Sequence, residues 1–258
     1  MSICSPNAFH HEQTIAAVRS GKHVLVEKPM ACTVEEADEM IAAADGAGVV
    51  LHVAHNMRYI PAIVGVRDAM ERVGEIFGVR AAFGHSGPSH WAPDSTWFFD
   101  RKLSGGGALI DLGIHAVDFV LYATGLAVTD VAAMTHGDAD VENAGEAILR
   151  FDGGAIGFVH ASWVVRPPLD FALVVFGSQG TLRLDAGSPP VFRAATAEKH
   201  EVAQPSVDTD LYADFVRAIR GEPAPGPAQP ATGADGRRAL AVVCAAYEAA
   251  HTGSTVSV

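Results

Sequence analysis

Short apolar runs alternate with amphipathic stretches at the start of the chain. Three short, mainly apolar runs predict strands at 1–4, 23–26 and 49–53. Between them, apolar residues recur at helical spacing and predict helices at 10–20 and 33–47. Strands and helices that alternate with short connections indicate a parallel sheet with helices on its faces. These few elements make a poor sheet by themselves, so we expect the second half of a doubly wound domain.

The second of these helices has a clear start and a clear stop. Thr33 carries a hydroxyl suited to an N-cap, and Glu36 follows it at the spacing of a capping box. Gly48 comes directly after the last residue of the helical pattern. We therefore expect a helix that begins after Thr33 and ends at Gly48.

The pattern changes after Asn56. We expect a helix at 60–72, an alternating strand at 75–85, a loop rich in Pro, Gly, Ser and Trp at 86–105, and an apolar helix at 108–123. From 128 to 193 only strand signals occur, and turns at 152–154 and 177–180 predict two hairpins. This part therefore reads as α+β, with a large and mainly antiparallel open sheet.

Two helices close the chain. The first is expected at 209–220, and the second begins at Asp235 as N-cap and stops near Gly253. The connection 221–234 between them contains four prolines, which predicts a stiff and exposed segment.

Composition narrows the class of protein. The chain has 258 residues, with 18 Lys and Arg against 30 Asp and Glu, for a formal net charge of −12. Nucleic acids and anionic membrane surfaces are bound by clustered Lys and Arg, so we expect neither as a partner. No run approaches the ~18 consecutive apolar residues of a membrane span, and we expect no secretory leader. Cys4, Cys32 and Cys244 lack CxxC spacing, which predicts reduced thiols in a cytoplasmic protein without a metal site.

Lys28 is the first candidate for chemistry. It lies between the apolar run 23–26 and Pro29, and the proline pushes the residue before it towards an extended backbone. Its side chain would project from the carboxyl end of a parallel strand, where such sheets bind ligands. A desolvated ammonium there can exchange a proton with a substrate hydroxyl. The alternative is a lysine at a strand end that reaches to water.

Asp111 and His115 form a second candidate. They are four residues apart on the predicted helix, hence on one face, and Asp118 and Tyr122 extend the same stripe. A carboxylate beside an imidazole can hold one tautomer and stabilise its cation, so we expect His115, backed by Asp111, to act as an acid–base group. Two alternatives remain, a stripe that faces water and a metal site.

Four stretches resemble one family. They are Ser-Pro-Asn-Ala-Phe-His at 5–10, Gly-Lys-His-Val-Leu-Val-Glu-Lys-Pro at 21–29, His-Asn-Met-Arg-Tyr-Ile-Pro at 55–61 and Gly-Gly-Gly-Ala-Leu-Ile-Asp-Leu-Gly-Ile-His-Ala-Val-Asp at 105–118. In this order and spacing they are similar to the Gfo/Idh/MocA oxidoreductases, which are dehydrogenases of sugars, inositols and related polyols. The resemblance implies a partial dinucleotide-binding (Rossmann) domain at 1–56 and an α+β domain for substrate binding and oligomerisation at 57–258.

The resemblance also implies a reaction and its residues. A hydride would pass between NAD or NADP and a secondary alcohol of a sugar, inositol or related polyol. The residues implied for the cofactor are Ser5, Pro6, Asn7, His10, Glu27, Lys28 and Arg58. Those implied for the substrate are Lys28, Trp97, Asp111 and His115, and the catalytic residues among all of these are Lys28, Asp111 and His115.

Each of the remaining candidates has a structural alternative. Asn7 can cap the next helix, with His10 exposed in its first turn. Arg58 can pair with a carboxylate at the domain interface, and Trp97 can simply be packed. The run Gly105–Gly107 can offer backbone N–H groups to substrate oxygens or form a tight turn.

One expected motif is missing. No G-x-G-x-x-G follows a strand, so the sequence predicts a family member without the N-terminal part of the Rossmann domain. This leaves open a catalytically silent chain that binds a small polyol or a protein partner, and an NAD-dependent enzyme of the same fold that cleaves glycosides. We also expect a homo-oligomer, which would bury either the first strand or the face of the second sheet.

Overall fold

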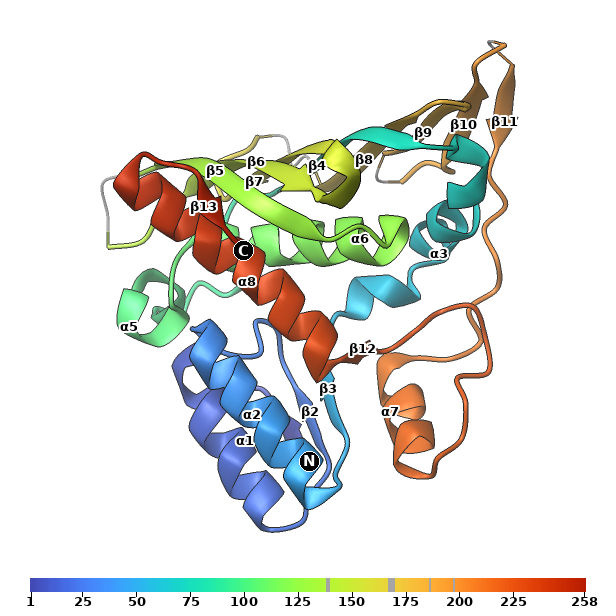
Figure 1. Cartoon of the computed structure of the whole chain (residues 1–258). Coiled ribbons are helices and arrows are strands. Elements are labelled where there is room, and N and C mark those ends of the chain that lie inside the picture. The colour runs from blue at the N-terminus through green and yellow to red at the C-terminus, as the bar shows by residue number, and fades with distance from the viewer. Residues whose placement is uncertain (138–139, 167–169, 186, 197) are drawn as a thin grey trace.

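Two β-sheets organise the chain in the computed structural model, which describes residues 1–137, 140–166, 170–185, 187–196 and 198–258. The smaller sheet lies at one end of the molecule, with α1 and α2 beside it, and the larger sheet forms a layer at the other end (Figure 1). The predicted fold class, a Rossmann-like parallel sheet joined to a mainly antiparallel sheet, is confirmed.

The smaller sheet is built from the first part of the chain. Its parallel strands are β1 (Ser2–Ile3), β2 (Val24–Val26) and β3 (Leu51–Val53), and the connecting helices are α1 (His10–Arg19) and α2 (Val34–Ala47). Strands β2 and β3 are buried throughout, as their mainly apolar runs predict. The carboxyl ends of β1 and β2 point towards the larger sheet's domain.

The predicted start and stop of α2 are confirmed. The Thr33 hydroxyl accepts a hydrogen bond from the Glu36 amide at 3.2 Å, and the Glu36 carboxylate accepts one from the Thr33 amide at 3.2 Å. Gly48 ends the helix in the left-handed conformation, with φ of 64°. Because α2 starts shortly after Pro29, the capping box also anchors the far end of the loop that carries Lys28.

The larger sheet has the strand order β11-β10-β9-β8-β4-β7-β6-β5-β13 among the described residues. Its strands are β4 (Ile76–Gly84), β5 (Val128–His136), β6 (Ala144–Phe151), β7 (Ile156–Ser162), β8 (Asp170–Gly177), β9 (Gly180–Asp185), β10 (Val191–Ala194), β11 (Lys199–Glu201) and β13 (Val256–Ser257). Of these described strands, β4 and β7 are the one parallel pair, and both predicted hairpins, β6–β7 and β8–β9, are present. Strands β11 and β13 were not predicted.

Helices cover one face of this sheet. They are α3 (Pro61–Asp68), α6 (Ile114–Thr124) and α8 (Gly233–Thr252), and α6 and α8 lie below the sheet in Figure 1. The segment Arg101–Thr124 is long and apolar enough to cross a membrane, but most of it is buried inside the protein. Its apolarity is explained by core packing, in which Phe119 is among the largest fully buried side chains.

Several elements differ from their predicted form. The expected helix at 60–72 is α3 followed by a 3-10 turn at Met70–Val73. The expected loop at 86–105 contains α4 (Pro88–Trp91), a 3-10 turn at Trp97–Phe99 and α5 (Arg101–Ser104). The helix expected at 108–123 begins with a π-helical turn at Leu109–Gly113 before α6. Further 3-10 turns lie at Asn7–Phe9, Asn56–Tyr59 and Asp152–Gly154, and α7 covers Leu211–Ile219.

The end of the chain returns to the smaller sheet. Strand β12 (Ala231–Thr232) pairs antiparallel with β3, so the connection expected to be exposed ends in a strand with Ala231 buried. The N-cap of α8 is Thr232, whereas Asp235 is the third helical residue and completes a capping box. A Cβ on Gly236 would lie 2.6 Å from Val53, so the glycine lets α8 approach β3 closely.

Candidate active site

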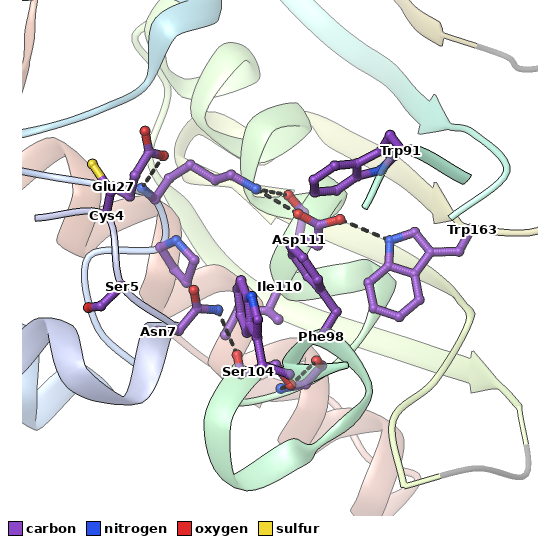
Figure 2. A pocket seen from close by; sticks show the side chains of 14 residues that line it. Cys4, Ser5, Asn7, Glu27, Trp91, Phe98, Ser104, Ile110, Asp111 and Trp163 are labelled. Atoms are coloured by element: carbon purple, nitrogen blue, oxygen red, sulfur yellow. Dashed lines mark hydrogen bonds and ion pairs between the residues drawn. The ribbon is translucent and has the colours of Figure 1, made fainter. Parts of the chain in front are cut away.

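A cavity of about 180 Å³ opens where the two parts of the chain meet. One wall follows the carboxyl ends of β1 and β2, and the other comes from the loop before α6, the first turn of that helix and the end of β7 (Figure 2). The lining residues are Cys4, Ser5, Asn7, Glu27, Lys28, Pro29, Trp91, Trp97, Phe98, Ser104, Gly106, Ile110, Asp111 and Trp163. The carboxyl edge of a parallel sheet is the ordinary ligand edge of this architecture.

Lys28 reaches across the cavity to Asp111. Its Nζ donates to the Asp111 backbone oxygen at 2.8 Å and to Asp111 Oδ1 at 2.7 Å. The second carboxylate oxygen, Oδ2, accepts a hydrogen bond from Trp163 Nε1 at 2.9 Å (Figure 2). The side chains of Lys28 and Asp111 are only 16% and 11% exposed, so their mutual attraction is weakly screened.

Asp111 therefore does not back His115 as expected. Residues four apart share a face in an α-helix, but Asp111 lies in the π-helical turn Leu109–Gly113, which changes that spacing. The hydrogen bonds of its carboxylate go to Lys28 and Trp163. The predicted Asp111–His115 pair is thus replaced by an Asp111–Lys28 pair.

His115 lies beside this pair, outside the cavity lining. Its ring meets the rings of His55 and Phe83 edge-on, at centroid distances of 6.3 and 5.8 Å. Its Nδ1 is buried and has no hydrogen-bond partner among the described residues. Desolvation, followed by the Lys28 ammonium and then by His55 and His85, lowers the pKa of His115 well below its usual value. The imidazole is therefore neutral near pH 7 and can accept a proton.

Asn7 and His10 hold the cavity wall together. The side-chain Nδ2 of Asn7 donates a hydrogen bond to the Ser104 backbone oxygen at 2.7 Å, and this bond connects the two walls of the cavity. His10 is fully buried, not exposed, and its ring nitrogens lie 2.8 Å from the backbone oxygens of Pro29 and Ser5. It thereby joins the two loops that follow β1 and β2. Neither side chain caps a helix.

The other residues implied for the cofactor divide into two groups. Ser5 and Glu27 line the cavity, and Glu27 Oε2 also accepts a hydrogen bond from the Lys28 amide at 3.2 Å. Pro6 is the N-cap of the turn at Asn7–Phe9 and is not among the lining residues.

Arg58 lies elsewhere, in a buried ion pair. Its Nε and Nη2 donate to the two carboxylate oxygens of Asp118 at 2.9 and 2.5 Å, and Asp235 Oδ2 is 3.6 Å away. Its guanidinium also stacks on the Tyr122 ring, 4.7 Å from the centroid. Only 4% of Arg58 is exposed, so the geometry matches the interface alternative and places the guanidinium outside the cavity.

All three tryptophans of the chain line the cavity. Trp97 does so as expected, and its ring stacks on Phe98 with a centroid distance of 3.8 Å. Trp91 and Trp163 were not singled out from the sequence. A useful signal was available, because Trp91 and Trp97 share the loop that precedes the Gly105–Gly107 run.

Two amides at and just after the end of the glycine run already have hydrogen-bond partners within the protein. The N–H groups of Gly107 and Leu109 donate to the carboxylate of Glu142 at 3.0 and 2.9 Å. Of the run Gly105–Gly107, the Gly107 amide is therefore already bonded within the protein and is not offered to substrate oxygens. Glu142 and its neighbour Tyr247 were missed because nothing near them in the sequence points to the glycines.

Two protein-family models match the chain. The model described as an oxidoreductase family with an NAD-binding Rossmann fold matches residues 1–55, and the GFO/IDH/MocA C-terminal domain model matches residues 66–183. The 1,5-anhydro-D-fructose reductase of Ensifer adhaerens is 32% identical over 269 positions, which cover 99% of this chain and 78% of that protein.

Solved structures agree with this match. The aldose-aldose oxidoreductase from Caulobacter crescentus, complexed with glycerol, is 26% identical with a TM-score of 0.85 and covers 100% of this chain and 78% of its own. The WlbA dehydrogenase from Bordetella pertussis, in complex with NADH and UDP-GlcNAcA, is 26% identical with a TM-score of 0.81 at the same coverage of 100% and 78%. Both similarities extend over the two sheets of this chain.

Proposed function

This chain belongs to the Gfo/Idh/MocA family of NAD(P)-dependent oxidoreductases, and we propose that it oxidises or reduces a secondary alcohol of a sugar, inositol or related polyol. The observation that carries the proposal is the Lys28–Asp111 pair at the edge of the cavity. The similarity to an anhydrofructose reductase and to an aldose-aldose oxidoreductase supports a sugar or polyol as the substrate class.

The residues on the β1 and β2 side of the cavity fit the nicotinamide end of NAD or NADP. A bound nicotinamide supplies a hydride donor or acceptor. Ser5 and Glu27 bring a hydroxyl and a carboxylate to the lining, which can hydrogen-bond the hydroxyls of a ribose. Asn7 contributes by holding this wall against Ser104. His10 contributes by holding together the two loops that follow β1 and β2, through its contacts with the backbone oxygens of Ser5 and Pro29.

Lys28 is proposed to bind the reacting oxygen of the substrate. An ammonium has three N–H donors, and two of them point to oxygens of Asp111. The third remains for a substrate hydroxyl or carbonyl, whose charge it would stabilise as the proton moves. Asp111 and Trp163 orient the ammonium, and Trp97 with its stacked partner Phe98 offers an apolar wall for a sugar ring.

His115 is proposed as the proton acceptor for alcohol oxidation. Its imidazole is neutral near pH 7 because burial and the Lys28 charge both lower its pKa. A neutral ring within reach of the substrate hydroxyl takes the proton that leaves with oxidation, and the imidazolium returns it on reduction.

We also propose that the chain forms a homo-oligomer through the open face of the larger sheet. On this face Ile148 and Phe158 lie opposite each other on β6 and β7, and they are 54% and 39% exposed. Ile156 and Met134 extend the apolar surface on the neighbouring positions of β7 and β5. Several exposed apolar side chains on one face of a sheet are a common feature of protein–protein interfaces.

Cofactor binding and turnover test the proposal together. All three tryptophans line the cavity, so NADH or NADPH bound there should quench their fluorescence in a saturable way at micromolar concentrations. Incubation with NAD or NADP and a panel of aldoses, anhydrosugars and inositols should then yield reduced nicotinamide with at least one of them. The proposal would be refuted if NADH and NADPH caused no quenching and no member of the panel were turned over.

A further inference from the structure

Two residues accept the hydrogen bonds of all four free amides at the start of the helix that carries Asp111. The first four amides of a helix lack partners inside it, and here they belong to Gly107, Ala108, Leu109 and Ile110. Glu142 accepts three of them, through Oε2 from Gly107 at 3.0 Å, through its backbone oxygen from Ala108 at 3.1 Å and through Oε1 from Leu109 at 2.9 Å.

Tyr247 of α8 completes this arrangement. Its hydroxyl accepts from the amides of Ile110 and Gly107, both at 3.2 Å, and donates to Glu142 Oε1 at 2.8 Å. Burial, followed by the neighbouring carboxylate, raises the pKa of Tyr247 well above its usual value, so the hydroxyl keeps the proton that it donates. We call Glu142 and Tyr247 the capping pair.

The surrounding charges and the space left by two glycines both stabilise the position of the capping pair. The Glu142 carboxylate is buried at the positive end of a helix dipole, and Arg101 Nη2 lies 3.9 Å from its Oε2. A Cβ on Gly106 would lie 2.1 Å from the Tyr247 hydroxyl, and one on Gly107 would lie 1.8 Å from the Glu142 backbone oxygen. Gly106 therefore permits the close approach of the Tyr247 side chain, and Gly107 that of the Glu142 backbone.

Asp111 follows directly after the capped amides. Its own amide makes the first bond inside the helix, to the Gly107 oxygen at 3.1 Å, and the π-helical turn Leu109–Gly113 surrounds it. The direction of its carboxylate towards Lys28 and Trp163 thus depends on the register in which this turn begins. The capping pair holds that register from outside the cavity, because neither of its members is a lining residue.

We propose that Glu142 and Tyr247 are positioning residues, which set the turn that aims Asp111 at Lys28. This inference rests on the proposed function for its kinetic consequence, but the placement of Asp111 can be measured without any substrate. The indole N–H resonance of Trp163 reports the placement of Asp111, because this N–H donates to Asp111 Oδ2.

The test compares Tyr247→Phe and Glu142→Gln with Tyr122→Phe in the full chain. Tyr122 lies near the other end of α6, and its hydroxyl accepts from Arg67, so this control loses one hydroxyl on the same helix without touching its start. The indole N–H resonances are recorded by ¹H–¹⁵N NMR, with Trp163→Phe to assign the signal and Asp111→Ala to show its position without the carboxylate.

We expect Tyr247→Phe and Glu142→Gln to move the Trp163 signal towards its Asp111→Ala position, and Tyr122→Phe to leave it in place. In the active enzyme, kcat should fall at least tenfold in both variants while KM for the nicotinamide changes less than twofold. A Trp163 signal at its wild-type position in both folded variants would overturn the inference. If the wild-type chain turns over no sugar or polyol, the proposed function fails, and the NMR result still decides whether the capping pair places Asp111.

Discussion

Lys28 and Asp111 meet through both the backbone and the side chain of the aspartate. The Lys28 Nζ lies 2.8 Å from the Asp111 backbone oxygen and 2.7 Å from its Oδ1. A lysine held at two points loses most of the freedom of its long side chain, so its remaining N–H has a defined direction. This contact also joins the two parts of the chain, because Lys28 follows β2 and Asp111 precedes α6.

The first prediction concerns Lys28→Met. It keeps most of the side-chain volume but removes the ammonium, and we expect kcat/KM to fall by about 100-fold or more, the usual effect of losing one donor that stabilises charge on a reacting oxygen. The fold should persist in the circular dichroism spectrum, because Asp111 keeps its hydrogen bond from Trp163. Lys22→Met, at an exposed position beyond α1, is the matched control. Equal turnover in the two variants would remove Lys28 from the mechanism.

The second prediction separates the two possible roles of Arg58. In Arg58→Met the buried Asp118 carboxylate loses its bidentate partner, and breaking a buried pair from one side costs about 3–5 kcal/mol of unfolding free energy. The double variant Arg58→Met/Asp118→Leu should recover most of that loss, because the Asp118 charge is removed together with its bidentate partner. Urea denaturation measures both effects.

The affinity for NADH distinguishes a structural role of Arg58 from a role in cofactor binding. Because the guanidinium lies outside the cavity, the Kd for NADH should stay within about twofold of wild type when the double variant is folded. A large rise in that Kd, with unfolding free energy unchanged, would instead assign Arg58 to the cofactor.

Local signals explain how much of the fold was predictable. The Thr33–Glu36 capping box, the Gly48 stop and the hairpin turn at 152–154 depend on residues close in sequence, and all are present. Strands β11, β12 and β13 have two or three residues each, and β12 and β13 exist through pairing with strands far away in the chain. Two or three residues are too few to show the alternation of apolar and polar positions that predicts a strand.

The site was predictable where one element carried it. Lys28 stood out because a buried strand and a proline flank it. Its partner Asp111 was found, but the wrong pairing was assigned, since the rule for residues four apart assumes α-helical geometry and the turn is π-helical. Trp163, Glu142 and Tyr247 were missed because their hydrogen bonds cross 33 to 140 positions of the chain.

The third prediction tests the open face of the larger sheet as the oligomer interface. Ile148→Glu places a charge opposite the exposed Phe158 on this face, and burying that charge in an interface would be costly. We expect the variant to elute as a monomer under conditions in which the wild-type chain is oligomeric, measured by size exclusion with light scattering. Val216→Glu, on α7 and 43% exposed, should keep the wild-type assembly. An oligomer that survives Ile148→Glu would rule this face out.

The last prediction concerns acid stability and the buried histidines. His52 lies on β3 with its ring 5.8 Å from Phe215, and its Nδ1 has no hydrogen-bond partner among the described residues. Burial, partly offset by Asp235 and Asp214, lowers the pKa of His52 below its usual value, and burial also lowers the pKa values of His55, His10 and His115.

A histidine whose pKa is lower in the folded state takes up its proton first in the unfolded chain. Above about pH 6.5 both states are neutral and the group contributes nothing, whereas below it each such histidine costs up to about 1.4 kcal/mol of unfolding free energy per pH unit. The loss stops only when the pH falls below the folded-state pKa. Stability should therefore decline from pH 6.5 downwards.

His52→Leu should weaken this decline, because leucine packs against Phe215 without titrating. We expect the variant to match the wild-type unfolding free energy at pH 8 to within about 1 kcal/mol and to exceed it at pH 5.5, measured by urea denaturation across the range. The slope that remains belongs to the other buried histidines, so it should be smaller but not zero. Parallel stability curves for the two proteins would show that His52 gains its proton as readily in the folded chain as in the unfolded one, which would contradict its burial on β3 as the source of acid sensitivity.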